Sequence, residues 1–195
     1  MTKNEVIREL QYYQMYMGEI ISCYYFNEAI CDLVQSKPST LFEYKLCLPT
    51  LTGALKYKQQ TVAAILLCRN DKSKSIPKSI DRILSEKIID DMLSYQKIKA
   101  ILHKINERID QNNDNILELK TYRDKVYAHF EQPLFDENWQ VEFKEEHNLD
   151  FTKLITLFVS IFNDFSKVLV ILGAEPYENS LINLSNVDAF LDKIK

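Results

Sequence analysis

The chain has 195 residues, enough for one domain with a buried core and short for two. Only three glycines occur, Gly18, Gly53 and Gly173, so neither a dinucleotide-binding fingerprint nor a P-loop can be assembled. With 24 Lys and Arg against 28 Asp and Glu, the net charge is −4, whereas proteins that grip long nucleic acids usually have a basic excess. Few glycines and five prolines also disfavour a turn-rich β-sandwich or barrel. The composition predicts an all-α protein.

The N-terminal half predicts three helices separated by polar connectors. The first opens with a capping box, Thr2-Lys3-Asn4-Glu5, and carries an apolar stripe of period close to 3.6 as far as about residue 33. A second helix is predicted over about residues 50–69. The polar connector 70–77 precedes a helical pattern over residues 79–89.

The C-terminal half predicts a long amphipathic helix over about residues 88–110, interrupted by the Asn-rich run 111–115. The next helix covers 116 to about 130, and an irregular segment follows over 131–148. The last helix spans about 150–172 and is ended by Gly173 and Pro176. We expect one domain over 1–195, with a core of about 3–173 and a C-terminal extension of 174–195. Its predicted architecture is an antiparallel up-and-down bundle of five to six helices.

Cysteine spacing and hydropathy limit the cellular setting. The four cysteines show no C-x-x-C spacing and no histidine at metal-ligand intervals (Cys23, Cys31, Cys47 and Cys68). We therefore expect neither a structural metal nor a disulfide framework. No apolar signal region opens the chain, and charged side chains interrupt the most apolar stretch, 151–172, so it is interpreted as a core helix. A cytoplasmic protein without membrane association is expected.

Candidate chemistry concentrates in residues 119–130. On an ideal helix His129 lies about 9 Å along the axis from Arg123 and about 120° around it, while Lys125 shares the face of His129. A guanidinium, an ammonium and an imidazole at one helix end suit a phosphodiester, because Arg can hold a phosphate bidentately and His can transfer protons near neutral pH. The alternative is a surface helix with ordinary charges and one half-buried histidine.

The run Arg123-Asp124-Lys125-Val126-Tyr127-Ala128-His129 resembles the Arg-x(4–6)-His signature of the HEPN superfamily, in particular its abortive-infection branch. Upstream, Cys68-Arg69-Asn70-Asp71, followed by Ser79-Ile80, resembles the Arg- and Asp-containing segment between the second and third helices of that branch. The two segments occur in the expected order. The resemblance covers roughly residues 5–172.

HEPN proteins are small helical bundles that usually dimerise, and many are metal-independent endoribonucleases that act as toxins or in phage defence. The resemblance implies that Arg123 and His129 form the catalytic pair and that Asp124 helps to orient the site. We assign Lys125, Arg69 and Tyr127 to substrate binding, and we expect no metal and no cofactor.

The resemblance also implies partners: an RNA substrate, a second copy of the chain, and an antitoxin or defence-system protein, without a stable DNA complex. One position departs from the family pattern. The toxin branch paired with nucleotidyltransferase antitoxins often has a tyrosine two residues after the histidine, where this chain has Glu131. Control by nucleotide addition at that position is therefore not expected.

RNA cleavage through the 2′-hydroxyl needs a base, an acid and a cation, and it needs no metal. A protomer is expected to supply one well-placed histidine, so a two-fold dimer that apposes two copies of His129 would provide both proton-transfer roles. The alternative function is a non-catalytic HEPN-like module that binds RNA or protein, because fold does not fix function.

Three further features have two interpretations each. The basic segment 69–82 could steer RNA or form a solvated loop in which Arg69 and Asp71 make fixing hydrogen bonds. The tyrosine-rich stretch 12–25 could stack bases or pack in the core and at an interface. His147, after Glu145 and Glu146, could join a weak metal site or be an ordinary loop residue.

Overall fold

The structure is a computed structural model, and it describes residues 1–36, 47–69, 74–86, 88–127 and 147–177; for 33–36, 47–50, 126 and 127 it describes the backbone alone. The described residues form helices and their connections, with no strand among them. The helices are α1 (Lys3–Ser36), α2 (Cys47–Leu67), α3 (Ile76–Ser85), α4 (Met92–Gln111), α5 (Asn113–Tyr122), the π-helical turn η2 (Arg123–Tyr127) and α7 (Phe151–Ile171). The all-α prediction is confirmed for this part of the chain.

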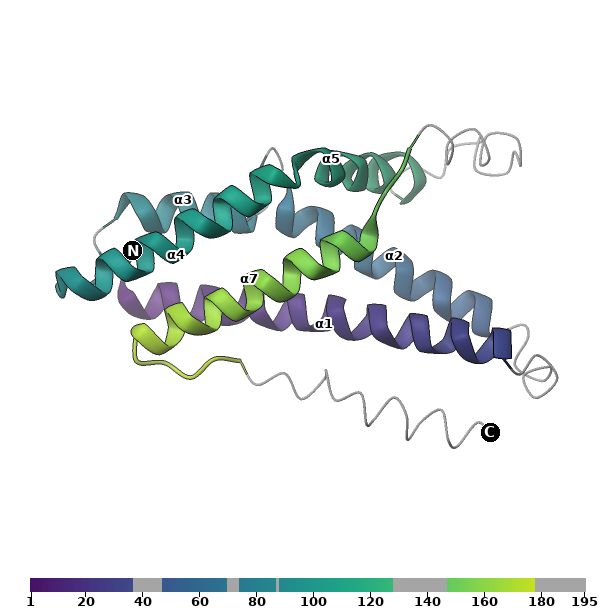
Figure 1. Cartoon of the computed structure of the whole chain (residues 1–195), viewed down its shortest axis with the longest axis horizontal. Helices are drawn as coiled ribbons and strands as arrows, with labels where there is room; N and C mark the ends of the chain where they lie inside the picture. Colours follow the sequence, from purple (N-terminus) through teal and green to yellow (C-terminus); the bar gives the residue numbers. More distant parts are fainter. Residues whose placement is uncertain (37–46, 70–73, 87, 128–146, 178–195) are drawn as a thin grey trace.

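The helices run alternately up and down along the long axis of the molecule (Figure 1). α1 runs in one direction, and α2 followed by α3 returns beside it. α4 and α5 run in the direction of α1, and α7 returns. Within the described ranges, six α-helices thus make a bundle with four antiparallel passes, two of which are each divided into two helices.

The hydrophobic core is continuous across all six helices. The largest fully buried side chains of this core, Phe158 and Phe165, belong to α7. α7 packs against α1, α4 and α5. The buried amide of Gln14 in α1 adds a polar tie: Nε2 donates to the Phe162 carbonyl and to Ser166 Oγ, at 3.1 and 2.7 Å. Its Oε1 accepts from the backbone of Tyr177 at 2.9 Å, so the first residues after α7 lie along α1.

Local sequence signals account for the helix ends. The predicted capping box is confirmed, because Thr2 N–H donates to Glu5 Oε2 at 2.6 Å and Glu5 N–H donates to Thr2 Oγ1 at 3.2 Å. The predicted stop after α7 is also confirmed. Gly173 adopts φ 71°, and the N–H groups of Gly173 and Ala174 bond back to Val170 and Leu169, which is a Schellman motif.

Four predicted boundaries are wrong. α2 begins at Cys47 and α3 at Ile76, each three residues earlier than predicted, because a proline in the first helical turn gives up no hydrogen bond. α3 ends at Ser85 and α4 begins only at Met92, where Asp91 caps the backbone N–H groups of Leu93 and Ser94. The helix predicted over residues 88–91 therefore does not occur.

The Asn-rich interruption after α4 is shorter than predicted. Asn112 alone leaves the helical conformation, at φ −105° and ψ 12°, and its side chain donates to the Arg108 carbonyl at 2.8 Å. α5 begins at the next residue. Of the helix predicted over 116–130, residues 116–122 are α-helical, and residues 123–127 form a π-helical turn instead.

α7 is long and apolar enough to cross a membrane by length and composition, and half of its most apolar window is buried inside the bundle. Its buried side chains contact helices of the same chain, which agrees with the predicted core helix. We therefore describe α7 as a structural helix of the bundle.

A largely buried carboxylate joins α4 to α7. The Asp164 side chain is only 7% exposed. Its carboxylate accepts hydrogen bonds from Arg108 Nη2 at 2.5 Å and from Lys167 Nζ at 2.6 Å. Burial raises the pKa of Asp164, but hydrogen bonds from Lys167 and Arg108 and their positive charges outweigh it, so this pKa lies below its ordinary value. The carboxylate is therefore ionised in the folded protein at neutral pH.

We expect Asp164→Asn to lower the free energy of unfolding at pH 7 by roughly 3 kcal/mol, the low end for breaking a buried ion pair, because Arg108 and Lys167 still reach water. The unfolded pKa is about 3.9 and the folded pKa is lower, so the contribution is present above about pH 4 and is lost as the pH falls further. Urea unfolding of the wild type and the variant from pH 7 downward measures the difference between their free energies of unfolding. A difference that stays constant below pH 4, or an equal loss in the exposed-site control Asp32→Asn, would contradict a stabilising ion pair at Asp164.

Candidate functional site

The Arg123 segment lies at the end of α5, where the helix changes from α to π geometry. α2 packs against this turn, and the Arg123 side chain is only 16% exposed. Its Nε donates to Asp124 Oδ1 at 2.7 Å, which fixes the plane of the guanidinium. π-helical turns often occur at functional sites. The structure thus joins two of the predicted site residues, Arg123 and Asp124, in a direct contact.

The other predicted members of this segment are only partly visible. Lys125 is exposed to solvent. The side chain of Tyr127, and His129 altogether, lie outside the described residues, so the pairing of Arg123 with His129 stays a prediction. The π-helical turn also means that the separation expected on an ideal α-helix does not apply between them.

Arg69 follows the end of α2 and is engaged in two ion pairs. Its guanidinium lies 2.7 Å from Asp81 in α3 and 3.4 Å from Asp110 in α4. Asp81 also accepts from Asn106 Nδ2 at 2.9 Å. These contacts favour the interpretation in which Arg69 fixes the segment after α2, through Asp81 and Asp110, over the one in which it steers RNA. Asp71, the predicted partner, lies outside the described residues.

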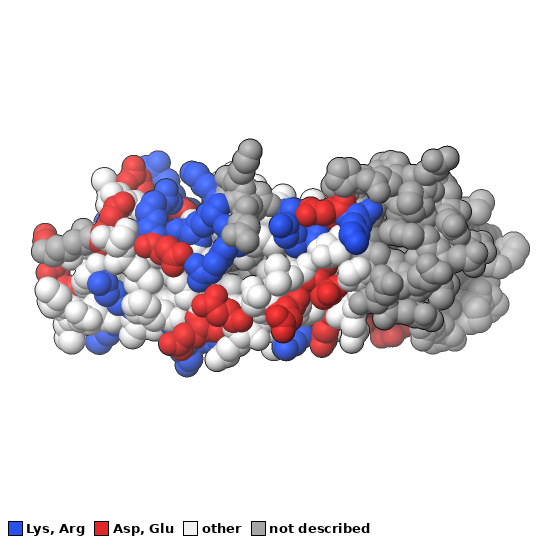
Figure 2. Space-filling model, turned by 90° about the horizontal axis from the view of Figure 1, so that it is seen from above, with Lys and Arg blue, Asp and Glu red and all other residues white. Residues whose placement is uncertain are grey.

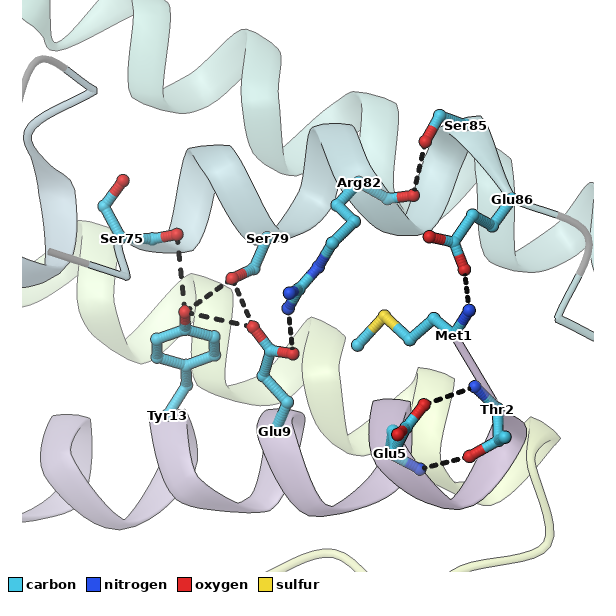
Figure 3. A network of polar contacts seen from close by, with 10 residues as sticks. All are labelled: Met1, Thr2, Glu5, Glu9, Tyr13, Ser75, Ser79, Arg82, Ser85 and Glu86. Atoms are coloured by element: carbon cyan, nitrogen blue, oxygen red, sulfur yellow. Dashed lines mark hydrogen bonds and ion pairs between the residues drawn. The ribbon is translucent and has the colours of Figure 1, made fainter. Parts of the chain in front are cut away.

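A second polar network joins α1 to α3 (Figure 3). The Tyr13 hydroxyl lies 2.6 Å from Ser79 Oγ, and Ser79 and Arg82 both donate to the carboxylate of Glu9. Burial raises the pKa of Tyr13 to about 12, so its hydroxyl keeps its proton. All four side chains are satisfied within the chain, which indicates a structural role.

A groove of about 940 Å³ opens between α1, the end of α2 and α3. Its lining is rich in aromatic and aliphatic side chains, including Tyr12, Tyr13, Tyr16, Val62 and Ile65. Tyr12 is 60% exposed and packs on Tyr16 with ring centroids 5.3 Å apart, whereas Tyr13 belongs to the core. Tyr13 therefore has the predicted packing role, and base stacking by Tyr12 stays a prediction. Arg123, Asp124 and Lys125 do not line this groove.

Positive and negative side chains are interspersed on the face that carries α3, α4 and α5. Figure 2 shows a group of Lys and Arg side chains there, with acidic side chains among and beside them. The described part of this face therefore shows no unbroken basic surface. The arrangement fits the net charge of −4 and favours contact with a few phosphates over a broad electrostatic footprint.

Sequence reasoning missed the position of His147. Its ring Nδ1 lies 2.9 Å from Glu118 Oε2 in α5, and its backbone carbonyl accepts from the Tyr122 hydroxyl at 3.0 Å. The imidazole of His147 therefore packs against α5, whose last residue, Tyr122, directly precedes Arg123. His147 lies 29 residues after Glu118 in the sequence, so no periodic pattern could have paired them.

The described residues contain no group of three or more His, Cys, Asp or Glu side chains that could hold a metal ion. Cys23, Cys31 and Cys68 form no disulfide within the described part of the chain. Burial raises the pKa of Cys23, which keeps that thiol protonated at neutral pH.

Comparisons with protein-family models, with curated proteins and with solved structures find no match to this chain. Any function must therefore be argued from the residues and their geometry.

The ion pairs of Arg69 generate a test of its role. We expect Arg69→Ala to lower the free energy of unfolding by about 1 kcal/mol, because it removes two partly exposed ion pairs that join three helices. Lys74→Ala, the matched loss of one exposed positive charge from the same basic segment, should cost less than half of that. The same two variants should weaken binding of single-stranded RNA equally in a filter-binding assay. A much larger loss of RNA binding for Arg69→Ala than for Lys74→Ala would indicate that Arg69 binds the substrate directly.

Proposed function

We propose that the chain is a metal-independent endoribonuclease of the HEPN type, acting in the cytoplasm as a toxin or phage-defence effector. It acts as a homodimer on RNA and is held in check by an antitoxin or another defence-system protein. The proposal includes a HEPN-like identity for the helical bundle. Neither a metal nor an organic cofactor takes part.

The contact between Arg123 and Asp124 carries the proposal. A guanidinium that is to hold a phosphate in one orientation needs a fixed plane, and the bond from Nε to Asp124 Oδ1 supplies one. The helix end concentrates positive charge as well, because exposed Lys125 lies two residues further on.

Each residue has a defined role in the proposed reaction. Arg123 binds the non-bridging oxygens of the scissile phosphate and stabilises the negative charge that grows in the transition state. Asp124 orients Arg123, and Lys125 attracts the neighbouring phosphate. His129 transfers a proton to or from the reacting oxygens, since an imidazole exchanges protons near neutral pH. Tyr127 provides a surface for a base next to the cleaved bond.

The direct test is cleavage of a single-stranded RNA by the purified chain in excess chelator. We expect cleavage to persist and to leave 2′,3′-cyclic phosphate and 5′-hydroxyl ends, because the attacking group is the RNA's own 2′-hydroxyl. His129→Ala should abolish cleavage, and it should also relieve growth arrest when the chain is expressed in cells. Activity that disappears with chelator and returns with Mg²⁺ or Mn²⁺ would refute the metal-independent mechanism.

We expect Arg123→Lys to lower kcat by about 100-fold, because Lys keeps the charge but lacks the planar pair of donors that fits a phosphate. Loss of the bond to Asp124 should cost at most about 1 kcal/mol of folding free energy, so the melting curve should barely move. Arg8→Lys, the same exchange at an exposed position of α1, is the matched control and should keep full activity. Equal activity of Arg123→Lys and Arg8→Lys would reduce Arg123 to a general electrostatic role.

A second candidate function is a non-catalytic module that binds RNA, and the groove between α1, α2 and α3 favours it. Exposed Tyr12 and the adjoining Tyr16 could stack bases there, and exposed Lys74 at the rim could meet a phosphate. Under this alternative, Tyr12→Ser weakens RNA binding and Arg123→Lys does not. Under the enzymatic proposal the order of the two effects is reversed.

A further inference from the structure

The groove between α1, the end of α2 and α3 has the size and the lining of a small-molecule site. Its volume of about 940 Å³ lies within the range of about 300–1,000 Å³ that is usual for pockets that hold small ligands. Tyr12 and Tyr16 line it from α1, and Val62, Ile65 and Leu66 line it from α2. A ligand with an apolar body would therefore find apolar surface on two helices.

An ion pair bounds the groove beyond Tyr16. There Lys58 Nζ of α2 lies 2.9 Å from Glu19 Oε2 of α1, so the two helices are joined. Tyr16 and Val62 line both the groove and the small recess beside this ion pair. A groove that is bounded in this way suits a compact molecule better than a long chain.

The negative charges of the groove are engaged within the chain. Figure 3 shows the three carboxylates of its described lining in contact with other groups. The pairs are Glu5 with the Thr2 N–H, Glu9 with Arg82 and Ser79, and Glu86 with the amino group of Met1. None of these carboxylates therefore needs a cationic ligand.

Two positive charges of the groove are placed differently. Arg8 in α1 and Lys74 before α3 are exposed, and neither makes an ion pair with the residues that the structure describes. The charge of Arg8 does act on Glu5, since it adds to the hydrogen bonds from Thr2 that lower the pKa of Glu5. The guanidinium of Arg8 nevertheless keeps its donors for another acceptor. The groove is therefore complementary to a negatively charged group.

Arg8 and Tyr12 set the distance between the charge and the ring of such a ligand. They are four residues apart on α1, so they share one face and are separated by about one helical turn of ~5.4 Å. Tyr12 is 60% exposed even though it packs on Tyr16, so much of its ring is open to a flat group. A ring that lies on Tyr12 thus brings an acid group attached directly to it beside Arg8.

We propose that this groove binds a small aromatic acid, a flat ring system that carries one carboxylate, sulfonate or phosphate group. The ring lies on Tyr12, next to the aliphatic side chains of α2. The guanidinium of Arg8 holds the acid group through two parallel hydrogen bonds, and Lys74 attracts it to the groove.

A strand of RNA fits this groove less well than a single acid. A strand that continued along α1 would meet Glu5 in one direction and Glu19 in the other. Two exposed cations also match one acid group better than a run of phosphates. Arg123 and its neighbours Asp124 and Lys125 do not line the groove, so the site is separate from the proposed cleavage and does not depend on it.

The test measures binding of benzoate to the full-length chain by NMR titration. We expect one saturable site with a Kd on the order of 1 mM, which is the affinity of a well-placed fragment of this size. Benzyl alcohol keeps the ring but has no charge, and it should bind about 10-fold more weakly. Cyclohexanecarboxylate keeps the charge but is not flat, and it should bind about 5-fold more weakly.

Two variants test the two contacts separately. Arg8→Gln should weaken benzoate binding about 10-fold and leave benzyl alcohol binding unchanged, because only the acid group contacts Arg8. Tyr12→Ser should weaken the binding of both ring compounds about 5-fold. Tyr25→Ser is the matched control, because Tyr25 is an exposed tyrosine of α1 that packs on Tyr24 with ring centroids 5.5 Å apart and does not line the groove. Lys3→Gln removes an exposed charge of α1 outside the groove, and both controls should keep the wild-type affinity.

Several outcomes would overturn the inference. They are the absence of saturable benzoate binding, equal affinity of the wild type and Arg8→Gln or Tyr12→Ser for benzoate, and binding of benzyl alcohol or cyclohexanecarboxylate as tight as that of benzoate. A short single-stranded RNA that displaces benzoate and binds Tyr12→Ser more weakly would assign the groove to RNA instead. A chain that binds benzoate as expected but does not cleave RNA would refute the proposed function and leave this site in place.

Discussion

The packing of α7 is the constraint on which both the core and the candidate site depend. Its fully buried phenylalanines, Phe158 and Phe165, lie in the core shared with α1 and α4. The same helix is preceded by Asp150, whose side chain caps it and whose backbone bonds to Asn115 in α5. The placement of His147, three residues before Asp150, is thereby set by the helix that builds the core. A substitution that loosens α7 should therefore change the geometry of the site as well as the stability.

Arginines in this chain serve mainly to join helices, which changes the meaning of its charge count. Arg69, Arg82 and Arg108 each bond to a carboxylate of another helix or pass of the bundle. Arg123 also contacts a carboxylate, that of the adjacent residue Asp124. The number of basic residues alone therefore overstates the positive charge that this chain can offer to a polyanion.

The sequence predicts most of the fold, because the deciding signals are local. The capping box at Thr2, the stop at Gly173 and the apolar face of α7 each depend on a few neighbouring residues, and each is confirmed. The errors arise where a local rule has two outcomes: a proline can end a connector or open a helix, as Pro77 does. The π-helical turn at Arg123, which packs against α2, has no such local signal in the sequence. The partners of Arg69 and His147 lie far away in sequence, so periodicity could not identify them.

One short length of helix carries most of the proposed chemistry, which explains how an acidic protein could cleave RNA. Arg123, Asp124 and Lys125 lie in the π-helical turn that follows α5, and residues 147–150 lie against α5 itself. Such a site neutralises a few phosphates at most, so its affinity for RNA should come from the geometry at one phosphodiester and not from a broad positive field. Weak general attraction also lets the two product ends leave. The neighbouring helices α2, α4 and α7 pack against α5 and hold it in place together with residues 147–150.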